Sequence, residues 1–208
     1  MDKIDFKKKF KSLYSPSSKQ PSIVDVPAMN FAVLEGVGNP NNSKLFADSI
    51  EALFGLSYTI SMSYKGDALK IPNFCSYTVP PLEGIWDLVN YEDFNKDNFK
   101  WTIGIMQPEF VTIDIFEKAK EIAYDKKKNE LIKNIALKTV SDGLCCTFMH
   151  IGSYDDEKAS FSLMEEYAEA QGYKRAEKIH REIYLNDFRK VPPEKLKTVL
   201  RFKVTKQR

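Results

Sequence analysis

Residues 178–185 alternate between apolar and polar side chains, which is the pattern of a β-strand with two unlike faces. The aliphatic face needs a layer to pack against. The other face carries an imidazole, a carboxylate and a phenol, from His180, Glu182 and Tyr184. Such a face is either exposed to water or lines a cavity, and the choice between the two decides most of the functional question.

Apolar residues recur at spacings of three and four in three longer segments, and this periodicity predicts amphipathic helices. We expect one helix after the polar turn 39–43, ending near Gly55. A second is expected to begin at Thr112, and a third to follow residues 153–156 and end at Gly172. A short helix is also expected within residues 3–14, before a linker rich in serine and proline.

The remaining apolar stretches favour strands. Residues 23–38 form one such stretch, interrupted by Pro27, and the segment 58–101 is typical of a β-meander. Further strands are expected at 99–107 and at 198–204. The tripeptide Ser141-Asp142-Gly143 between two strand-like segments predicts a β-hairpin.

Two parts of the chain share the same order of elements, which predicts an internal repeat. Residues 31–56 and 145–173 each read as a strand, a glycine, a polar turn, an amphipathic helix and a glycine near its end. We therefore expect an α+β fold in which a duplicated strand-helix-strand-strand module forms one antiparallel sheet, with helices on one face and a ligand cleft on the other. The expected single domain covers 1–208, with an N-terminal helix and linker at 1–20 and repeats at 21–134 and 135–208.

Charge and composition exclude several classes of function. The 208-residue chain has a formal net charge of +2, from 31 basic and 29 acidic residues, so direct binding to nucleic acid is not expected. No apolar run approaches the roughly 18 residues of a membrane span, and the N-terminus lacks a secretory signal. Three cysteines without a CxxC pair fit a reducing compartment. We expect a cytoplasmic protein without membrane association; the sequence indicates no oligomeric state.

Three glutamates are candidates for chemistry. Glu182 comes first, because a carboxylate in an apolar, aromatic-lined cleft has a raised pKa that suits general acid–base catalysis. The alternative is an exposed strand carboxylate beside Lys178 or Arg181. Glu157 falls in or near the first turn of a helix, where an acid also stabilises the helix dipole by about 0.3–1 kcal/mol. Glu83 is the weakest of the three.

Aromatic side chains supply candidate walls for a ligand. Any one of them on a strand is more often a plain core residue, but a set around a concave sheet would hold a polycyclic, hydrophobic molecule. No third ligand accompanies the two histidines at metal-binding spacing, and nucleotide-binding motifs are absent, so neither a metal nor a cofactor is expected. With His180, the candidate substrate-binding residues are Trp86, Trp101, Tyr154, Phe31 and Phe148.

Six stretches in a fixed order make the chain resemble the GyrI-like small-molecule-binding domain family. Each is weak alone, but their order along nearly the whole chain is specific. One departure is Ser153, where the family pattern has a proline before the tyrosine, and this affects the expected stiffness of the loop. The stretches are DFKKKFKSLY, VDVPAMNFAVLEGVGNPN, PPLEGIW, FKWTIGIMQPEFVT, DGLCCTFMHIGSYDDEKA and EIYLNDFRKVPPEKLKTVLRF.

The resemblance implies a function as well as a fold. Some members follow a DNA-binding helix-turn-helix segment, but only about 20 residues precede the first expected strand here, too few for such a module, so a stand-alone member is expected. Members similar to that branch hydrolyse cyclopropanoid DNA-alkylating compounds without a cofactor, which is a detoxifying activity. Glu182 or Glu157 would then activate water, and Tyr184 or the other glutamate would donate a proton. The alternatives are a non-catalytic binder or sensor of hydrophobic or cationic drugs, and a gyrase-interacting protein.

Overall fold

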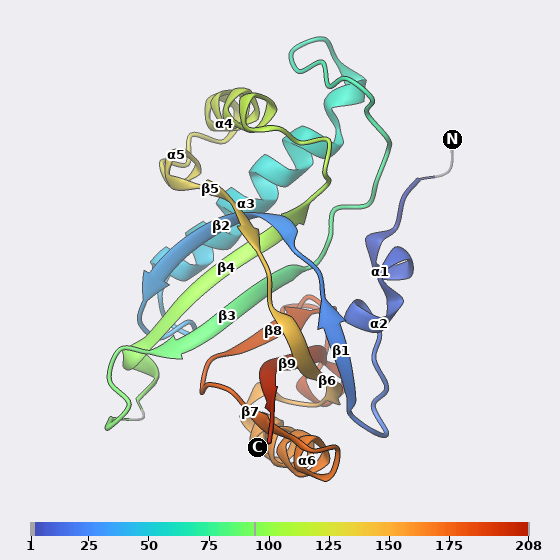
Figure 1. Ribbon diagram of the computed structural model, residues 1–208. Helices are drawn as coiled ribbons and strands as arrows, with labels where there is room; N and C mark the ends of the chain where they lie inside the picture. The colour runs from blue at the N-terminus through green and yellow to red at the C-terminus, as the bar shows by residue number, and fades with distance from the viewer. Residues whose placement is uncertain (1–2, 94, 208) are drawn as a thin grey trace. The chain divides into compact units, whose positions relative to one another are not determined.

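The computed structural model describes residues 3–93 and 95–207, and these divide into two compact units (Figure 1). The first unit contains the described residues of 1–6, 29–82 and 88–140, and the second contains those of 7–28, 83–87 and 141–208. Each unit combines antiparallel strands with packed helices. The α+β class expected from the sequence is therefore confirmed, while the repeat boundaries stay predictions.

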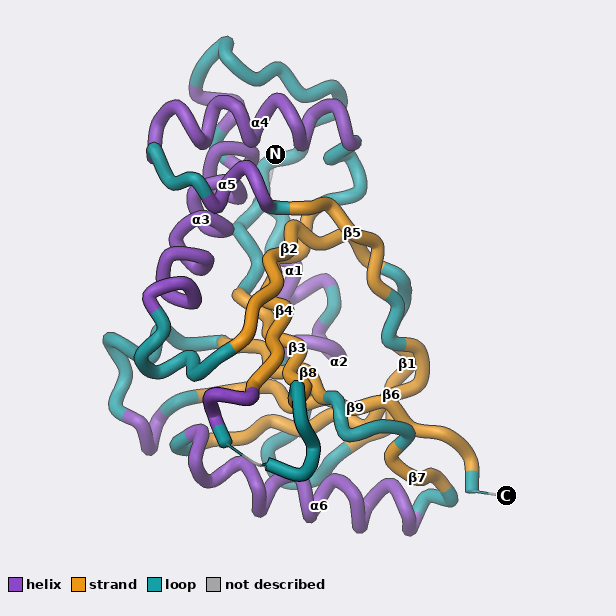
Figure 2. The backbone as a smooth tube through the Cα atoms, turned by 90° about the vertical axis from the view of Figure 1, so that its left-hand side faces the viewer, coloured by secondary structure: helices purple, strands orange, loops and turns teal. Residues whose placement is uncertain are grey.

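The described residues of the first unit form three strands, and helices pack against them. The central strand pairs antiparallel with both of its neighbours, and α3 packs against it, with α4 and α5 alongside α3 (Figure 2). α3 begins directly after the polar turn 39–43, as expected, and the Ser43 hydroxyl caps it by accepting a hydrogen bond from the Phe46 amide. The elements in chain order are β2 (Met29–Val37), α3 (Lys44–Ser61), β4 (Phe99–Gln107), α4 (Ile113–Lys127), α5 (Leu131–Asn134) and β5 (Ala136–Val140).

The long helix of this unit corrects one expectation. We predicted that α3 would end near Gly55 and that a β-meander would begin at Tyr58, but the helix continues to Ser61. A glycine inside a helix costs only about 1 kcal/mol relative to alanine, and burial of Leu56 and Ile60 on the next turns outweighs this cost. Of the described residues of the expected meander at 58–101, only 82–88 and 99–101 belong to strands.

The described residues of the second unit form six strands, the short helix α2 and the longer helix α6. Its strand order is β1-β6-β9-β8-β3, and β7 also pairs with β9. A four-residue helix, α1 (Phe6–Lys9), precedes it, so the expected N-terminal helix is broken into two short pieces. The elements are α2 (Lys11–Tyr14), β1 (Ser22–Val26), β3 (Leu82–Leu88), β6 (Gly143–Ile151), α6 (Glu157–Ala170), β7 (Tyr173–Arg175), β8 (His180–Tyr184) and β9 (Lys197–Lys206).

Apolar packing places α6 on one face of the strands of this unit. Met164 and Ala168 of the helix are fully buried against Phe148, Leu200 and Phe202 of β6 and β9. The neighbouring positions of β9 point to the opposite face. There the N-terminal segment packs, and the guanidinium of a buried arginine of β9 donates a hydrogen bond of 2.7 Å to the Leu13 carbonyl.

The expected hairpin around residues 141–143 is wrong. β5 pairs with β2, whereas β6 pairs with β1 and β9. The polar tripeptide is typical of a turn, but turn chemistry does not determine which strands pair. Here the Asp142 carboxylate accepts two hydrogen bonds from Arg181, so the side chain binds an arginine of the sheet. No helix within the described residues is long and apolar enough to cross a membrane.

Candidate functional site

A chain of hydrogen bonds connects two strands of the second unit at the functional candidates. The Trp86 indole N–H of β3 donates to the Tyr184 hydroxyl at 2.8 Å, and this hydroxyl donates to Oε2 of Glu182 at 2.8 Å. The other oxygen of Glu182, Oε1, lies 3.1 Å from Nε2 of His180. Both oxygens of the Glu182 carboxylate are therefore held, and a carboxylate retains further lone pairs for an incoming water.

Strand alternation places these three residues of β8 on one face, as predicted. The register with β9 sets Tyr184 opposite Thr198 and Glu182 opposite Leu200. Glu182 is 9% exposed, so it is not an ordinary surface carboxylate. The structure thus removes the reading of Glu182 as an exposed strand residue.

The N-terminal end of α6 brings a second carboxylate to the same face. Glu157 begins the inward stripe that continues through Phe161, Met164 and Ala168, and it is only 6% exposed. Burial raises its pKa, and the neighbouring charge of Glu182 and a hydrogen bond to that carboxylate add to the effect, giving a pKa of about 10. Glu157 therefore holds its proton at neutral pH beside Glu182.

Two phenols border the carboxyl pair. The Tyr154 ring contacts the Tyr184 ring edge-on, with ring centroids 5.9 Å apart. Burial, followed by the charge of Glu182, raises the pKa of Tyr184 well above its ordinary value and that of Tyr154 to about 12. Both phenols are therefore neutral at physiological pH. Ser153, at the departure from the family pattern, accepts a hydrogen bond from the Asp155 amide and so caps the turn that carries Tyr154.

A buried ionic network holds β8 from its opposite face. The Arg181 guanidinium donates two hydrogen bonds to Asp142 and one of 3.0 Å to Glu83, which also accepts from the Tyr14 hydroxyl at 2.7 Å. Arg181 immediately precedes Glu182, so the network determines where the catalytic candidate lies. Glu83, the weakest of the three glutamate candidates, is thus a structural partner of this network.

A glycine leaves the room that the indole and phenol occupy. A Cβ at Gly84 would lie 2.7 Å from Nε1 of Trp86 and 3.0 Å from the Tyr184 hydroxyl. Both distances are too short for carbon, so any larger residue would displace the hydrogen-bonded pair. In the stretch PPLEGIW, the glycine is therefore needed to leave space for the tryptophan side chain two residues later.

Two buried oxygens at this site have no hydrogen-bond partner among the described residues: Oε1 of Glu157 and Oγ1 of Thr198. Thr198 of β9 lies opposite His150 of β6 on one side and opposite Tyr184 of β8 on the other, so it is in the same row as the candidates. Unsatisfied buried oxygens are costly and favour a bound polar group. Thr198 was missed from the sequence, because only the strand register shows its neighbours.

The structure brings together six of the residues predicted from the sequence: Glu182, Glu157, Tyr184, Trp86, Tyr154 and His180. Three further candidates lie elsewhere. Phe148 belongs to the apolar core under α6. Trp101 and Phe31 belong to the first unit, where both are buried, and Trp101 packs edge-on against Phe46 with ring centroids 5.1 Å apart.

The face of the sheet that carries the site differs from our expectation. From the sequence we expected His180, Glu182 and Tyr184 on a helix-free face. In the structure α6 packs on this face, and the His180 ring contacts the Phe161 ring of α6 with centroids 4.8 Å apart. The site therefore lies at the N-terminal end of α6, where the first inward-facing residue of the helix is Glu157 and the later ones are apolar.

Comparison with protein families gives a match over residues 19–205, nearly the whole chain, to the GyrI-like small molecule binding domain. The chain belongs to the GyrI-like family. Small-molecule binding is thus the general role of the domain, and the expected family resemblance is confirmed. A comparison with curated protein sequences found no match.

Solved structures extend the GyrI-like assignment. An uncharacterized conserved protein from Listeria innocua is 36% identical with a TM-score of 0.91, and a hydrolase from the same organism is 34% identical with a TM-score of 0.90. Each alignment covers 98% of this chain and 100% of the other. The EcmrR C-terminal domain is 15% identical with a TM-score of 0.53, over 90% of this chain and 98% of that domain, and shows the shared fold alone.

Proposed function

We propose that this GyrI-like protein hydrolyses cyclopropanoid DNA-alkylating compounds by adding water across a strained cyclopropane. The observation that carries the proposal is the buried carboxyl pair, in which Glu157 is held protonated beside Glu182. Because the pKa of Glu157 is raised, this residue can serve as the acid while the neighbouring carboxylate serves as the base. The resemblance of the sequence to the stand-alone branch and the hydrolase among the structural neighbours support the same activity.

The proposed reaction uses the two glutamates in different roles. Glu182 accepts a proton from water, and the water oxygen bonds to the cyclopropane carbon. The carbon–carbon bond of the ring breaks, and its electron pair moves into the conjugated dienone, whose carbonyl oxygen takes the proton of Glu157 and becomes a phenol. Ring strain and aromatisation drive the step, so the protein contributes position and charge stabilisation.

The hydrogen bond between the two carboxyl groups provides a path that restores their starting protonation states after the reaction. After the reaction Glu182 holds the proton from water and Glu157 is ionised, and the proton returns between them because burial disfavours the charge on Glu157. Tyr184 stays neutral and donates to Glu182, while the Trp86 indole holds Tyr184. Trp86 and Tyr154 provide apolar surface for a planar substrate.

Turnover of a planar, aryl-fused spirocyclopropyl cyclohexadienone tests the proposal. The purified protein is mixed with this compound and the ring-opened phenol is measured by mass spectrometry. We expect turnover well above the uncatalysed rate, and its loss in Glu182→Gln with retained binding. The matched control is Glu166→Gln, an exposed position of α6, which should react like the wild type. Absence of product with the wild-type protein, or unchanged turnover in Glu182→Gln, would contradict the assignment.

The second candidate function is non-catalytic binding of hydrophobic cations. It is favoured by the aromatic rings of Trp86, Tyr154 and Tyr184 around the Glu182 carboxylate, since an apolar cation gains from both. In that case Glu182→Gln should weaken the binding of a lipophilic cation, and the dienone should remain intact. Titration with tetraphenylphosphonium alongside the turnover assay separates the two functions.

A further inference from the structure

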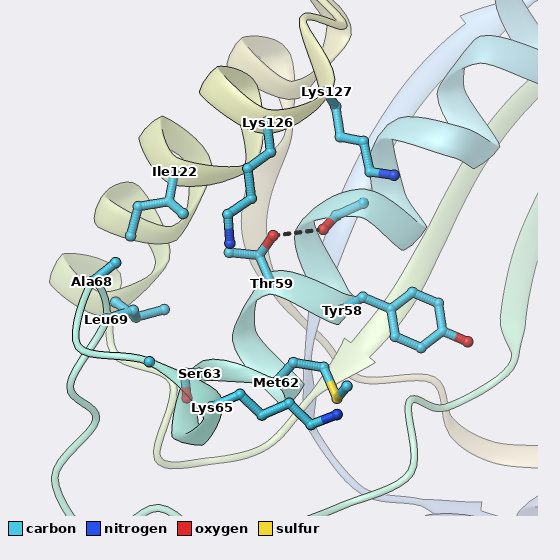
Figure 3. Close-up of a pocket in the computed structure, with 12 residues that line it drawn as sticks. Tyr58, Thr59, Met62, Ser63, Lys65, Ala68, Leu69, Ile122, Lys126 and Lys127 are labelled. Carbon is cyan, nitrogen blue, oxygen red and sulfur yellow. Dashed lines mark hydrogen bonds between the residues drawn. The ribbon is translucent and has the colours of Figure 1, made fainter.

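A hollow lies in the first unit. It measures about 320 Å³ and opens where α3 ends, between that helix and α4 (Figure 3). This size is at the lower end of the range for small-molecule pockets. Its lining residues are Gly55, Tyr58, Thr59, Met62, Ser63, Lys65, Gly66, Ala68, Leu69, Ile122, Lys126 and Lys127.

The inner surface of the hollow is mostly apolar. Ile122 of α4 and Leu69 approach from one side and Met62 from the other (Figure 3). Tyr58 and Met62 are 54% and 39% exposed, which is high for such side chains. Large apolar residues that remain exposed beside a concavity indicate a surface that a ligand covers.

Three lysines border this apolar surface. Lys126 extends from α4 toward Thr59 of α3, Lys127 lies across α3, and Lys65 closes the opposite edge (Figure 3). None of the twelve lining residues is acidic. No salt bridge to any of these three ammonium groups is found in the part of the chain that the structure describes.

Lys127 lies close to the backbone of α3 at Gly55. A Cβ at Gly55 would lie 3.4 Å from Cγ of Lys127, so the alkyl stem of the lysine rests directly on the helix backbone. The Thr59 hydroxyl donates to the Gly55 carbonyl at 2.9 Å and can still accept a hydrogen bond. The hollow thus combines an apolar floor with a cationic and hydrogen-bonding rim.

We propose that this hollow binds a small amphipathic anion, a carboxylate or sulfonate with a short aliphatic or aromatic body. The body would pack on Met62, Leu69 and Ile122, and the anionic head would lie between Lys126 and Lys127. Such a ligand has the opposite charge preference from the carboxyl site of the second unit. The proposal is independent of the proposed hydrolysis and goes beyond it.

Octanoate and its uncharged analogue octanamide are the probes that test this site. Both are titrated by isothermal calorimetry and by displacement of fluorescent anilinonaphthalene sulfonate. We expect octanoate to bind and octanamide to bind at least about tenfold more weakly, because only the anion pairs with the lysines. Equal affinity of the two probes, or no octanoate binding at millimolar concentration, would overturn the proposal.

Variants locate the octanoate site. Lys126→Glu with Lys127→Glu should weaken binding by about tenfold or more. The matched double variant Lys174→Glu with Lys195→Glu has the same charge change at exposed positions of the second unit, and it should bind like the wild type. Equal weakening in both would show that net charge alone attracts octanoate, which contradicts a built site.

Two single variants complete the test. Ala68→Trp places a large ring at an exposed position of the rim and should abolish octanoate binding while the unfolding temperature changes little. Glu182→Gln should leave octanoate binding unchanged. Retained binding in Ala68→Trp, or loss in Glu182→Gln, would place the ligand elsewhere and refute the proposal. Binding to phosphatidylglycerol vesicles without binding to octanoate would equally contradict it.

Discussion

Replacing Glu157 with glutamine should make the protein more stable at neutral pH, although it alters a residue of the proposed catalytic pair. The folded-state pKa of Glu157, about 10, lies above the ordinary value of 4.5. Between these two pH values the folded state binds a proton that the unfolded state has lost. The contribution of Glu157 to the free energy of unfolding therefore falls as pH rises from about 4.5. Glutamine resembles the protonated carboxyl and does not titrate.

The size of the effect follows from the shift in pKa. Each pH unit above 4.5 costs about 1.4 kcal/mol in the wild type, because the unfolded carboxyl ionises freely and the folded one does not. At pH 7 the cost is about 3 kcal/mol. This is a large fraction of the 5–15 kcal/mol by which domains are typically stable. Near pH 4.5 the wild type and Glu157→Gln should differ little.

Urea unfolding of both proteins between pH 5 and pH 8 measures the difference directly. The two histidines and the other carboxylates are present in both proteins, so the difference in unfolding free energy isolates Glu157. We expect the advantage of Glu157→Gln to grow by about 1.4 kcal/mol per pH unit. The control Glu166→Gln should show no such slope. A flat difference, or a variant that becomes less stable than the wild type as pH rises, would refute the raised pKa.

Three further substitutions test the surroundings of the pair. Tyr184→Phe removes the hydroxyl that accepts a hydrogen bond from Trp86. We expect kcat to fall at least about tenfold with little change in KM, whereas a rise in KM with unchanged kcat would assign Tyr184 to binding. Gly84→Ala should displace the indole and phenol, lowering kcat and altering the near-ultraviolet circular dichroism, and an unchanged spectrum would contradict the steric argument. Arg181→Met removes the cation that Glu83 and Asp142 share and leaves Asp142 only the longer contact of 4.0 Å to Arg201. Urea unfolding should show a loss of about 3–5 kcal/mol, whereas a loss near zero would contradict the structural role of the network.

Local periodicity was enough to predict most elements of the fold. The break at Pro27, the N-cap at Ser43 and the helix that ends before Gly172 follow from residue chemistry close in sequence, and each is present in the structure. The continuation of α3 past Gly55 could not be predicted, because it depends on burial against strands distant in sequence. The absence of a hairpin at 141–143 has the same origin, since the partners of β5 and β6 are non-local.

The strand face that carries the candidate site could be predicted from the sequence, but most of the residues that contact this face could not. Alternation put His180, Glu182 and Tyr184 together, because strand geometry has a period of two. Phe161, Met164 and Ala168 follow Glu157 by 4, 7 and 11 residues, and this helical spacing could have shown that Glu157 points inward. Which of the two tryptophans joins the site could not be inferred, since the contact between Trp86 and Tyr184 spans 98 residues.

A single-turnover reaction of the spirocyclopropyl dienone in water enriched in oxygen-18 tests the proposed chemistry most directly. Direct attack by a water that Glu182 activates places one labelled oxygen on the former cyclopropane carbon and none in the protein. We predict this labelling, together with its loss in Glu182→Gln. Label in the Glu182 carboxyl group would instead indicate a covalent ester intermediate, and product formed equally fast without the protein would contradict catalysis by the Glu157 and Glu182 pair.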